Sequence, residues 1–376
     1  MVKFFNHKII QYKNNAYDAI IVDKSTSEFI KYCIPANVKY CEIGIRSEIP
    51  VIVSFKFFTN FLFNFVKTRK IILSSILSLA KINQAKIIIS FQDNLSLMGQ
   101  INRYNNKLLV ISIQNGTRSK HSHHGWSNIK YFPDLYGCGL YEKDLIKSLG
   151  GTINKYIASG SLKYGIYKRH YFKNSNQKNN NLTFISSWRD KRVKKFEQIV
   201  SKSQIKIIPN LHKFSLEGKY NFQILTATKK NDLLQKNEKN YFLSLNNNAD
   251  LNFLEKNYFY DSYHYCDNSR IIISYTSALA FEMYGLGIKT LFLGSINYIN
   301  DSPGYPWREI FDFLPKLVKA EDDDYIKISE KISDLINLSN ENYLEITKES
   351  RNYFMKYNNK FTHELVASRI SNKLIQ

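Results

Sequence analysis

Hydroxyl groups and a carboxylate follow one another at close spacing within residues 271–294. Thr276 and Ser277 stand where an apolar strand gives way to a helix, and Glu282 comes five residues after Ser277. A helix N-terminus with free N–H groups and hydroxyls binds anions such as phosphate. A carboxylate a turn and a half further along can accept hydrogen bonds from the hydroxyls of a sugar. Phosphate and ribose together indicate a nucleotide, although an ordinary strand–helix–strand unit with a capped helix gives the same pattern.

Two further polar clusters come directly after apolar segments in the first half of the chain. Asp93 is the isolated carboxylate of one cluster, which suits a general base but equally suits a helix cap. Asn115, Gly116 and Arg118 form the other, and an arginine there can hold a phosphate or carboxylate by two hydrogen bonds. Because the carboxyl ends of parallel strands meet at one edge of a sheet, we expect both clusters to face the same site.

Polar residues at the junction of the two halves are also candidates for binding a ligand. Gly160 and Ser161 follow a short predicted strand, and we interpret them as a hinge with backbone N–H groups facing the ligand, or as a plain turn. Arg189 follows the first predicted strand of the second half, where it is expected to contact a phosphate of the bound nucleotide. A basic first turn opposes the helix dipole, so a purely structural role is less favoured for Arg189.

No metal or cofactor is predicted. The spacing of His121, His123 and His124 can bind metal, but no carboxylate or cysteine accompanies them. We therefore favour a role for these histidines in binding a phosphate or an acceptor sugar. The cysteines form no CxxC pair and are interpreted as reduced thiols; they are Cys33, Cys41, Cys138 and Cys266.

Short apolar runs alternate with helical stretches along the chain, which is typical of a doubly wound α/β domain. The first series of predicted strands covers residues 16–23, 38–45, 86–91, 108–113, 135–139 and 156–159. A polar, low-complexity segment at 173–181 is the predicted linker. The second series covers 182–186, 220–226, 269–275 and 290–293, and the pattern from 322 to 376 is helical. We therefore predict an N-terminal domain at 1–172 and a C-terminal domain at 182–376.

The charge balance points to anionic partners. The 376 residues carry a formal net charge of +21, with 44% hydrophobic and 23% charged residues. No nucleic-acid-binding signature accompanies this charge, so a phosphate-bearing small molecule or an anionic membrane surface is favoured and nucleic acid is not expected. Residues 55–65 are rich in phenylalanine with basic residues after them, which fits either a membrane interface or a buried core helix. Without a signal-peptide core or a spanning segment, we expect a cytoplasmic protein that lies peripherally on the inner membrane.

Several of these segments, taken in order, resemble bacterial surface carbohydrate biosynthesis proteins from O-antigen and capsule gene clusters. The matching pieces are Asp93-Asn94, residues 113–118, Gly160-Ser161, residues 184–189, residues 261–263, and the spaced set Ser277, Glu282 and Gly287. Two positions depart from the pattern. Ala278 follows Ser277 where a threonine is expected, and Trp188 stands where a phenylalanine is expected.

The resemblance implies a metal-independent glycosyltransferase of the GT-B type, with two Rossmann-like domains facing a cleft and C-terminal helices. The C-terminal domain would hold the nucleotide-sugar donor, with Thr276 and Ser277 at its phosphate and Glu282 at its ribose. Arg189 and Arg118 would offset charge on the leaving group, and Asp93 would be the base. The donor would be a nucleoside-diphosphate sugar or a CMP-linked acidic sugar, and the acceptor a lipid-linked glycan. A sugar-nucleotide epimerase and a non-catalytic scaffold of a polysaccharide assembly complex are the alternatives.

Overall fold

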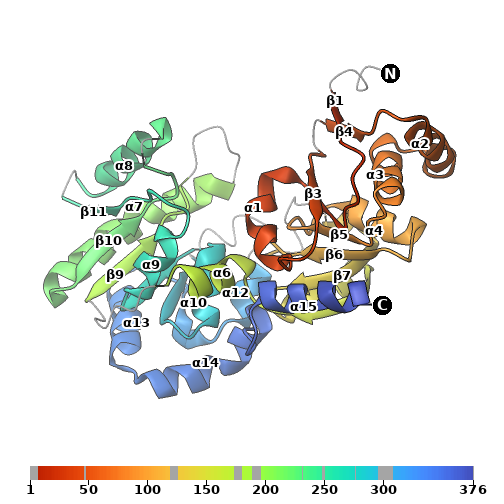
Figure 1. Ribbon diagram of the computed structural model, residues 1–376. Coiled ribbons are helices and arrows are strands. Elements are labelled where there is room, and N and C mark those ends of the chain that lie inside the picture. The colour runs from red at the N-terminus through yellow and green to blue at the C-terminus, as the bar shows by residue number, and fades with distance from the viewer. Residues whose placement is uncertain are drawn as a thin grey trace. The chain divides into compact units, whose positions relative to one another are not determined.

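The chain folds into two compact units, each built around a parallel sheet (Figure 1). The computed structural model describes residues 7–45, 48–118, 126–172, 180–188, 196–230, 232–247, 250–275, 277–294 and 308–375. By contacts, the first unit comprises Met1–Ile166 and Tyr357–Gln376, and the second comprises Tyr167–Lys356. Each unit is treated separately below.

Six parallel strands form the main sheet of the first unit, in the order β3-β2-β5-β6-β7-β8. These strands are β2 (Ala19–Val22), β3 (Tyr40–Ile43), β5 (Ile87–Ser90), β6 (Leu109–Ile113), β7 (Tyr131–Gly137) and β8 (Thr152–Ala158). All residues of β2 and β5 are buried, as expected for strands covered on both faces. Because the order reverses between β2 and β5, the sheet is doubly wound and its switch point lies there. A separate two-stranded parallel sheet joins β1 (Lys8–Gln11) to β4 (Glu48–Val51).

The first unit also contains α1 (Ser27–Ile30), α2 (Phe55–Thr68), α3 (Ile71–Ile82), α4 (Ser96–Tyr104), α5 (Tyr141–Ser148) and α15 (Thr362–Ile375). The sequence marks both ends of α2. The hydroxyl of Ser54 accepts a hydrogen bond from the backbone N–H of Phe57 at 3.1 Å, which caps the start. Arg69 ends the helix in the left-handed conformation with φ of 56°. A short turn therefore leads directly into α3.

The second unit contains a six-stranded parallel sheet in the order β11-β10-β9-β12-β13-β14. Its strands are β9 (Asn181–Ile185), β10 (Asn221–Leu225), β11 (Asn252–Leu254), β12 (Ile271–Ser274), β13 (Thr290–Leu293) and β14 (Lys319–Ala320). Counted along the chain this order is 3-2-1-4-5-6, the arrangement of dinucleotide-binding Rossmann domains. The switch point lies between β9 and β12.

The described helices of the second unit connect these strands or, in the case of α13 and α14, follow the last of them. They are α7 (Phe196–Gly218), α8 (Leu233–Leu245), α9 (Asp261–Asp267), α10 (Ala278–Gly285), α12 (Arg308–Phe313), α13 (Tyr325–Asn337) and α14 (Asn340–Phe354). Side chains cap the starts of the last two. Asp324 accepts hydrogen bonds from two backbone N–H groups of α13, and Ser339 accepts one from Asn342 in α14. The helix α6 (Leu162–His170) spans the boundary between the units.

Most of the predicted strands are confirmed, and so is the helical pattern after residue 322. The phenylalanine-rich residues 55–65 lie within α2, which is bounded by the cap at Ser54 and the left-handed turn at Arg69.

The contacts of α15 differ from the predicted domain boundaries, which assign residues 182–376 to one domain. Figure 1 shows α15 lying along β7 of the first unit. Val366 and Ile370 are fully buried there, and the guanidinium of Arg369 forms an ion pair with Asp134 of β7 at 3.0 Å. The chain therefore returns to the first unit after building the second.

Candidate functional site

The loops at the switch point of the second sheet carry the predicted donor-binding residues. Ser186 follows β9, and Ser277 follows β12. In a parallel sheet these loops emerge at the carboxyl edge, where doubly wound folds bind their ligands. The structure thus places the two loops next to each other at the edge of adjacent strands. Thr276 and Arg189, which were also predicted to contact the donor, lie outside the described residues.

Ser277 is the residue before the first turn of α10. Its own backbone N–H donates to the hydroxyl of Ser274 at 3.4 Å, and its side chain caps none of the helix N–H groups. The first N–H groups of a helix have no partner within the helix. The start of α10 is therefore a place where backbone donors and a hydroxyl are available to an anion.

Glu282 is held by an aromatic side chain from the preceding helix. Only 7% of Glu282 is exposed, and its Oε2 accepts a hydrogen bond from the hydroxyl of Tyr263 at 2.5 Å. The ring of Tyr167 stacks on that of Tyr263, with 5.2 Å between the centroids. Tyr263 belongs to residues 261–263, one of the segments that carry the resemblance to surface carbohydrate biosynthesis proteins. In the structure its hydroxyl orients the carboxylate of Glu282.

Gly287, the third member of the spaced set, is explained by the backbone. Its φ is +84°, a conformation that L side chains rarely adopt. A Cβ atom there would also lie 2.3 Å from Cδ2 of Leu344. Gly287 therefore ends α10 and admits the close packing of α14, and no ligand is needed to account for it.

Glu238 is a buried carboxylate of the second unit that the sequence did not reveal. It lies in α8 with 0% exposure and accepts hydrogen bonds from the hydroxyl of Ser186 at 2.5 Å and from the backbone N–H of Ala227 at 2.8 Å. The backbone N–H and hydroxyl of Thr228 donate to it at 3.0 and 2.6 Å. Glu238 thereby ties the loop after β9 to the loop after β10. One sequence feature could have indicated that Glu238 is buried: Phe242, an apolar residue, follows four positions later on the same face of α8.

In the first unit, the predicted site residues Asp93, Asn115 and Arg118 come together at the carboxyl edge of the sheet. The Asp93 carboxylate is 1% exposed. Arg118 donates to both of its oxygens, from Nε at 2.7 Å and from Nη2 at 2.5 Å. The indole N–H of Trp126 donates at 2.9 Å, and the backbone N–H of Asn115 at 3.3 Å. Four N–H groups thus donate hydrogen bonds to the carboxylate that was predicted to be the base.

Arg118 is buried together with its partner. Its side chain is 8% exposed, and Nη2 also donates to the side-chain oxygen of Asn115 at 2.6 Å. Burial by itself lowers the pKa of a guanidinium, but the Asp93 carboxylate outweighs this and raises the pKa of Arg118 above its ordinary value. Gly116 belongs to the same loop, where its carbonyl accepts a hydrogen bond from the side chain of Gln114 at 2.8 Å.

Glu142 is a second buried carboxylate beside this network. It lies in the first turn of α5 and accepts hydrogen bonds from the side chain of Gln114 at 2.8 Å and the backbone N–H of Gly139 at 3.1 Å. Burial raises the pKa of Glu142 to about 7, although those two hydrogen bonds act to lower it. Sequence reasoning missed Glu142 because it lies among the polar residues of an ordinary amphipathic helix.

Gly160 and Ser161 serve the local fold of the first unit. The φ of Gly160 is +74°, and its backbone N–H donates to the carbonyl of Cys138 at 3.1 Å. The hydroxyl of Ser161 accepts from the backbone N–H of Tyr164 at 3.2 Å, so it caps α6. From α15, the hydroxyl of Thr362 donates to carbonyls of this turn. The backbone N–H of Gly160 is thus already used within the fold.

Other predicted groups are described only in part. The four cysteines are buried free thiols. His121, His123 and His124 lie outside the described residues. Among the residues that the structure does describe, no group of three or more His, Cys, Asp or Glu side chains has an arrangement that would hold a metal ion.

The two parallel sheets with their connecting helices define a protein of two Rossmann-like units, and the predicted GT-B-like fold class is confirmed. Residues 110–366 match the family described as "putative O-antigen biosynthesis protein", and the chain belongs to that family. The resemblance to surface carbohydrate biosynthesis proteins is thereby confirmed. No curated protein matches the sequence.

Solved structures with the same fold include UDP-GlcNAc 2-epimerases and a wall teichoic acid polymerase. The S. aureus MnaA–UDP co-structure has 10% identity, a TM-score of 0.55 and 95% coverage of each chain. The Methanocaldococcus jannaschii UDP-GlcNAc 2-epimerase in complex with UDP-GlcNAc and UDP has 13% identity and a TM-score of 0.52, covering 98% of this chain and 99% of that one. The wall teichoic acid polymerase TagF has 13% identity and a TM-score of 0.55, covering 96% and 90%. At such identities the similarity concerns the fold alone.

Proposed function

We propose that this protein is a glycosyltransferase that moves a sugar from a nucleotide-activated donor to a lipid-linked glycan during surface polysaccharide biosynthesis. The observation that supports it most is the position of Ser277 at the carboxyl edge of a 3-2-1-4-5-6 sheet, beside its switch point, with Glu282 in the helix that starts there. Doubly wound sheets bind nucleotides at that place. The family of the chain provides the context of O-antigen biosynthesis.

In this proposal the start of α10 binds the donor's phosphates and Glu282 binds the ribose. Tyr263 would hold the Glu282 carboxylate in its binding orientation, because the hydrogen bond between them is short and buried. Thr276 and Arg189 stay predicted contacts of the phosphates. The donor would be a nucleoside-diphosphate sugar or a CMP-linked acidic sugar.

The residues of the first unit take a positioning role in the proposal. Asp93 was predicted to be the base, yet its oxygens accept four hydrogen bonds and its side chain is buried. A base needs a free lone pair within reach of the acceptor hydroxyl. We therefore propose that Asp93, with Arg118, holds the loop 114–118 in shape at the carboxyl edge where an acceptor would bind.

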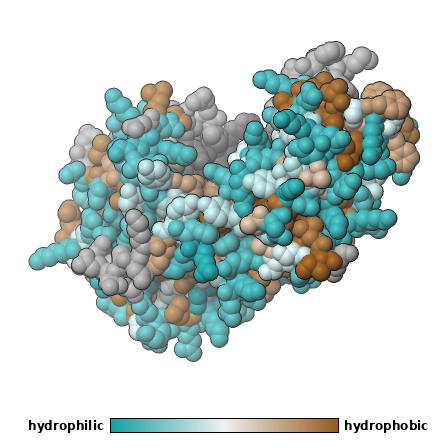
Figure 2. Space-filling model, viewed as in Figure 1, coloured by the Kyte–Doolittle hydropathy of each residue, from teal (hydrophilic) through white to brown (hydrophobic). Residues whose placement is uncertain are grey.

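The exposed face of α2 supports an acceptor that resides in a membrane. Phe55, Phe58 and Phe63 are 83%, 55% and 59% exposed, and Figure 2 shows apolar surface over this part of the first unit. The opposite face is polar in places, since Asn64 donates to the hydroxyl of Ser78 on α3 at 2.8 Å. A helix that shows its aromatic side chains to solvent beside basic residues is typical of binding at a membrane interface. Across the described residues, no helix is long and apolar enough to cross a bilayer.

A sugar-nucleotide epimerase is the second candidate, because several solved structures of this fold are UDP-GlcNAc 2-epimerases. An epimerase would use the same nucleotide site in the second unit. It would need neither a lipid-linked acceptor nor an exposed aromatic helix, and for this reason we favour the transferase.

The first experiment measures nucleotide binding by thermal shift with CMP, UMP, UDP, GDP and dTDP. A ligand at a hundredfold excess over its Kd stabilises the native state by about 2.7 kcal/mol, which raises the melting temperature by several degrees. We expect one nucleotide to do so, and Glu282→Ala to lose the response. Glu349→Ala, the same change at an exposed position of α14, is the matched control and should respond as wild type does. A flat response to all five nucleotides would contradict the proposal.

The second experiment separates the candidate activities by the need for an acceptor. The sugar nucleotide that corresponds to the binding nucleotide is incubated with the enzyme, with and without lipid-linked glycan from membranes. Transfer of labelled sugar to the lipid fraction only when the acceptor is present supports the transferase. An isomerised nucleotide sugar in the absence of acceptor would establish the epimerase instead, and nucleotide binding without any turnover would favour a scaffold.

A further inference from the structure

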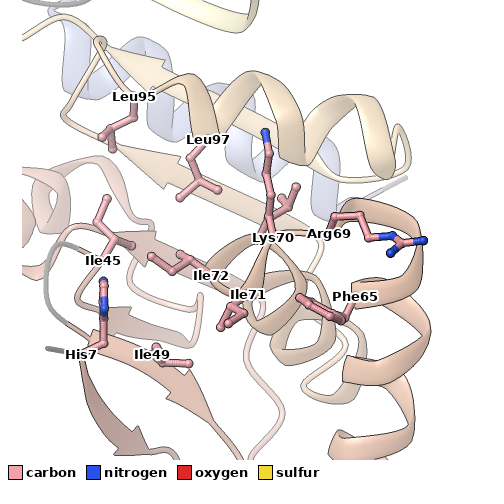
Figure 3. Close-up of a pocket in the computed structure, with 11 residues that line it drawn as sticks. His7, Ile45, Ile49, Phe65, Arg69, Lys70, Ile71, Ile72, Leu95 and Leu97 are labelled. Atoms are coloured by element: carbon pink, nitrogen blue, oxygen red, sulfur yellow. The ribbon is translucent and has the colours of Figure 1, made fainter. Parts of the chain in front are cut away.

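The first unit contains an apolar cavity of about 590 Å³ beneath the α2–α3 turn (Figure 3). Eight of its eleven lining residues are Ile, Leu or Phe, and they come from the segment after β3, from β4, from α2 and α3, and from the entry into α4. Figure 3 shows Leu95 and Leu97 on one side of it and Ile71 and Ile72 on the other. The volume lies within the range of small-molecule binding sites.

Basic side chains stand at the rim of this apolar cavity. Arg69 and Lys70 both line it, and in Figure 3 their charged ends point away from the apolar centre. The Nζ of Lys70 donates to the side chain of Gln100 at 2.7 Å. Arg69 makes no ion pair within the part of the chain that the structure describes. The site is therefore complementary to an amphiphile with a hydrocarbon chain and an anionic head.

The cavity lies at the same edge of the sheet as the Asp93–Arg118 network. Ile45 comes two residues after the end of β3, and Leu95 comes two residues after Asp93. Both are thus at the carboxyl ends of their strands, where doubly wound sheets bind substrates. A chain held in the cavity would have its head group at the edge that we assign to the acceptor. This position favours the acceptor lipid over a phospholipid of the surrounding membrane.

We propose that this cavity binds the part of a lipid phosphate's hydrocarbon chain that adjoins its head group, with the phosphate at Arg69 and Lys70, so that it is the lipid subsite of the acceptor. The inference rests on the proposed transferase function, since it names the chemistry of that acceptor's lipid. The exposed phenylalanines of α2, which are Phe55, Phe58 and Phe63, do not line the cavity. The cavity is lined instead by Phe65 of the same helix, which is partly buried. Membrane contact and lipid capture are therefore separate features of the same helix.

The test measures binding of radiolabelled geranylgeranyl phosphate to the full-length protein by equilibrium dialysis. Leu97→Trp fills the cavity with a larger apolar side chain, and we expect it to weaken binding at least tenfold. Arg69→Asn removes the charge with a residue that tolerates the left-handed backbone, and we expect a loss of about three- to tenfold. Phe58→Ala, on the exposed face of α2, is the control and should bind within twofold of wild type. A melting temperature close to that of wild type verifies the fold of each variant.

Two comparisons separate the lipid sources. Neither inorganic phosphate nor vesicles of phosphatidylglycerol should displace the labelled lipid, whereas unlabelled geranylgeranyl phosphate should. Vesicle binding itself should fall in Phe58→Ala and persist in Leu97→Trp. Equal binding by wild type and Leu97→Trp, or displacement by phosphatidylglycerol vesicles, would overturn the proposal.

The readout is independent of the nucleotide site. If wild type responds to a nucleotide but binds no geranylgeranyl phosphate, the lipid subsite is refuted and the transferase proposal stands. If the lipid binds as expected but no nucleotide does, the transferase proposal is refuted and the lipid site stands.

Discussion

Replacing Asp93 with asparagine separates a positioning role from a role as base. Asp93→Asn exchanges one carboxylate oxygen for an NH₂ group and removes the charge. Whichever oxygen is replaced, the new NH₂ group faces two N–H donors, because Oδ2 accepts from Arg118 and Trp126, and Oδ1 accepts from Arg118 and Asn115. Two hydrogen bonds are lost and the guanidinium is left buried without its counter-ion.

The expected loss is that of a broken buried ion pair, about 3–5 kcal/mol. In a unit of this size each kcal/mol shifts the melting temperature by about 2–4 °C, so the first unit should melt about 10 °C lower. Replacing both partners by apolar side chains, as Asp93→Leu with Arg118→Met, leaves no unpaired charge and should recover most of the loss.

The assay is urea unfolding followed by the fluorescence of Trp126, with Trp188 and Trp307 changed to phenylalanine. Trp126 is 3% exposed and donates to Asp93, so its signal reports on the first unit. If Asp93→Asn unfolds within about 1 kcal/mol of wild type and yet loses all transfer activity, the positioning role is refuted and Asp93 acts as the base.

Three further substitutions probe Glu142, Glu238 and Gly287. The folded state keeps the proton of Glu142 up to about pH 7 whereas the unfolded state releases it near the ordinary glutamate pKa of 4.5, so the free energy of unfolding should fall by about 3 kcal/mol as the pH rises between these values. Glu142→Gln should flatten that slope in urea titrations at pH 5 and 8, and an unchanged slope would contradict the assignment. Glu238→Gln places an NH₂ group against backbone donors, so it should cost about 1–3 kcal/mol and weaken the nucleotide-induced thermal shift; a full-sized shift would show that the loop after β9 does not contact the nucleotide. Gly287→Ala should cost about 1–2 kcal/mol by thermal melting, and Leu344→Ala in the same chain should relieve the steric part; full wild-type stability would refute the strain.

The strands were the most predictable part of the fold. β2, β5, β12 and β13 are fully buried and mostly apolar, and a parallel sheet covered on both faces requires such strands. The packing of α15 was not predictable in the same way. Its apolar spacing predicts a helix with one buried face, but nothing in that spacing says which unit will cover the face.

The candidate site was predictable in its location but not in its contacts. Polar residues after apolar strands indicated the carboxyl edges, and Asn115 and Arg118 lie there with Asp93. The partners of a buried carboxylate are donors from distant parts of the chain, so the sequence did not show that Asp93 is fully engaged. Glu238 was missed for the same reason, since its partners are the hydroxyl of Ser186 in the loop after β9 and backbone N–H groups in the loop after β10.

The return of α15 to the first unit has a consequence for synthesis on the ribosome. Residues 357–376 leave the ribosome only after the whole second unit, Tyr167–Lys356, has been made. Until then Asp134 lacks the guanidinium of Arg369, and the turn at Ser159 lacks the hydroxyl of Thr362. The first unit therefore cannot complete its fold until the second unit has been synthesised. A frameshift or stop codon shortly before residue 357 would leave every strand of both sheets in place and still strip the first sheet of a covering helix, so quality control would detect the damage in the half of the protein made first.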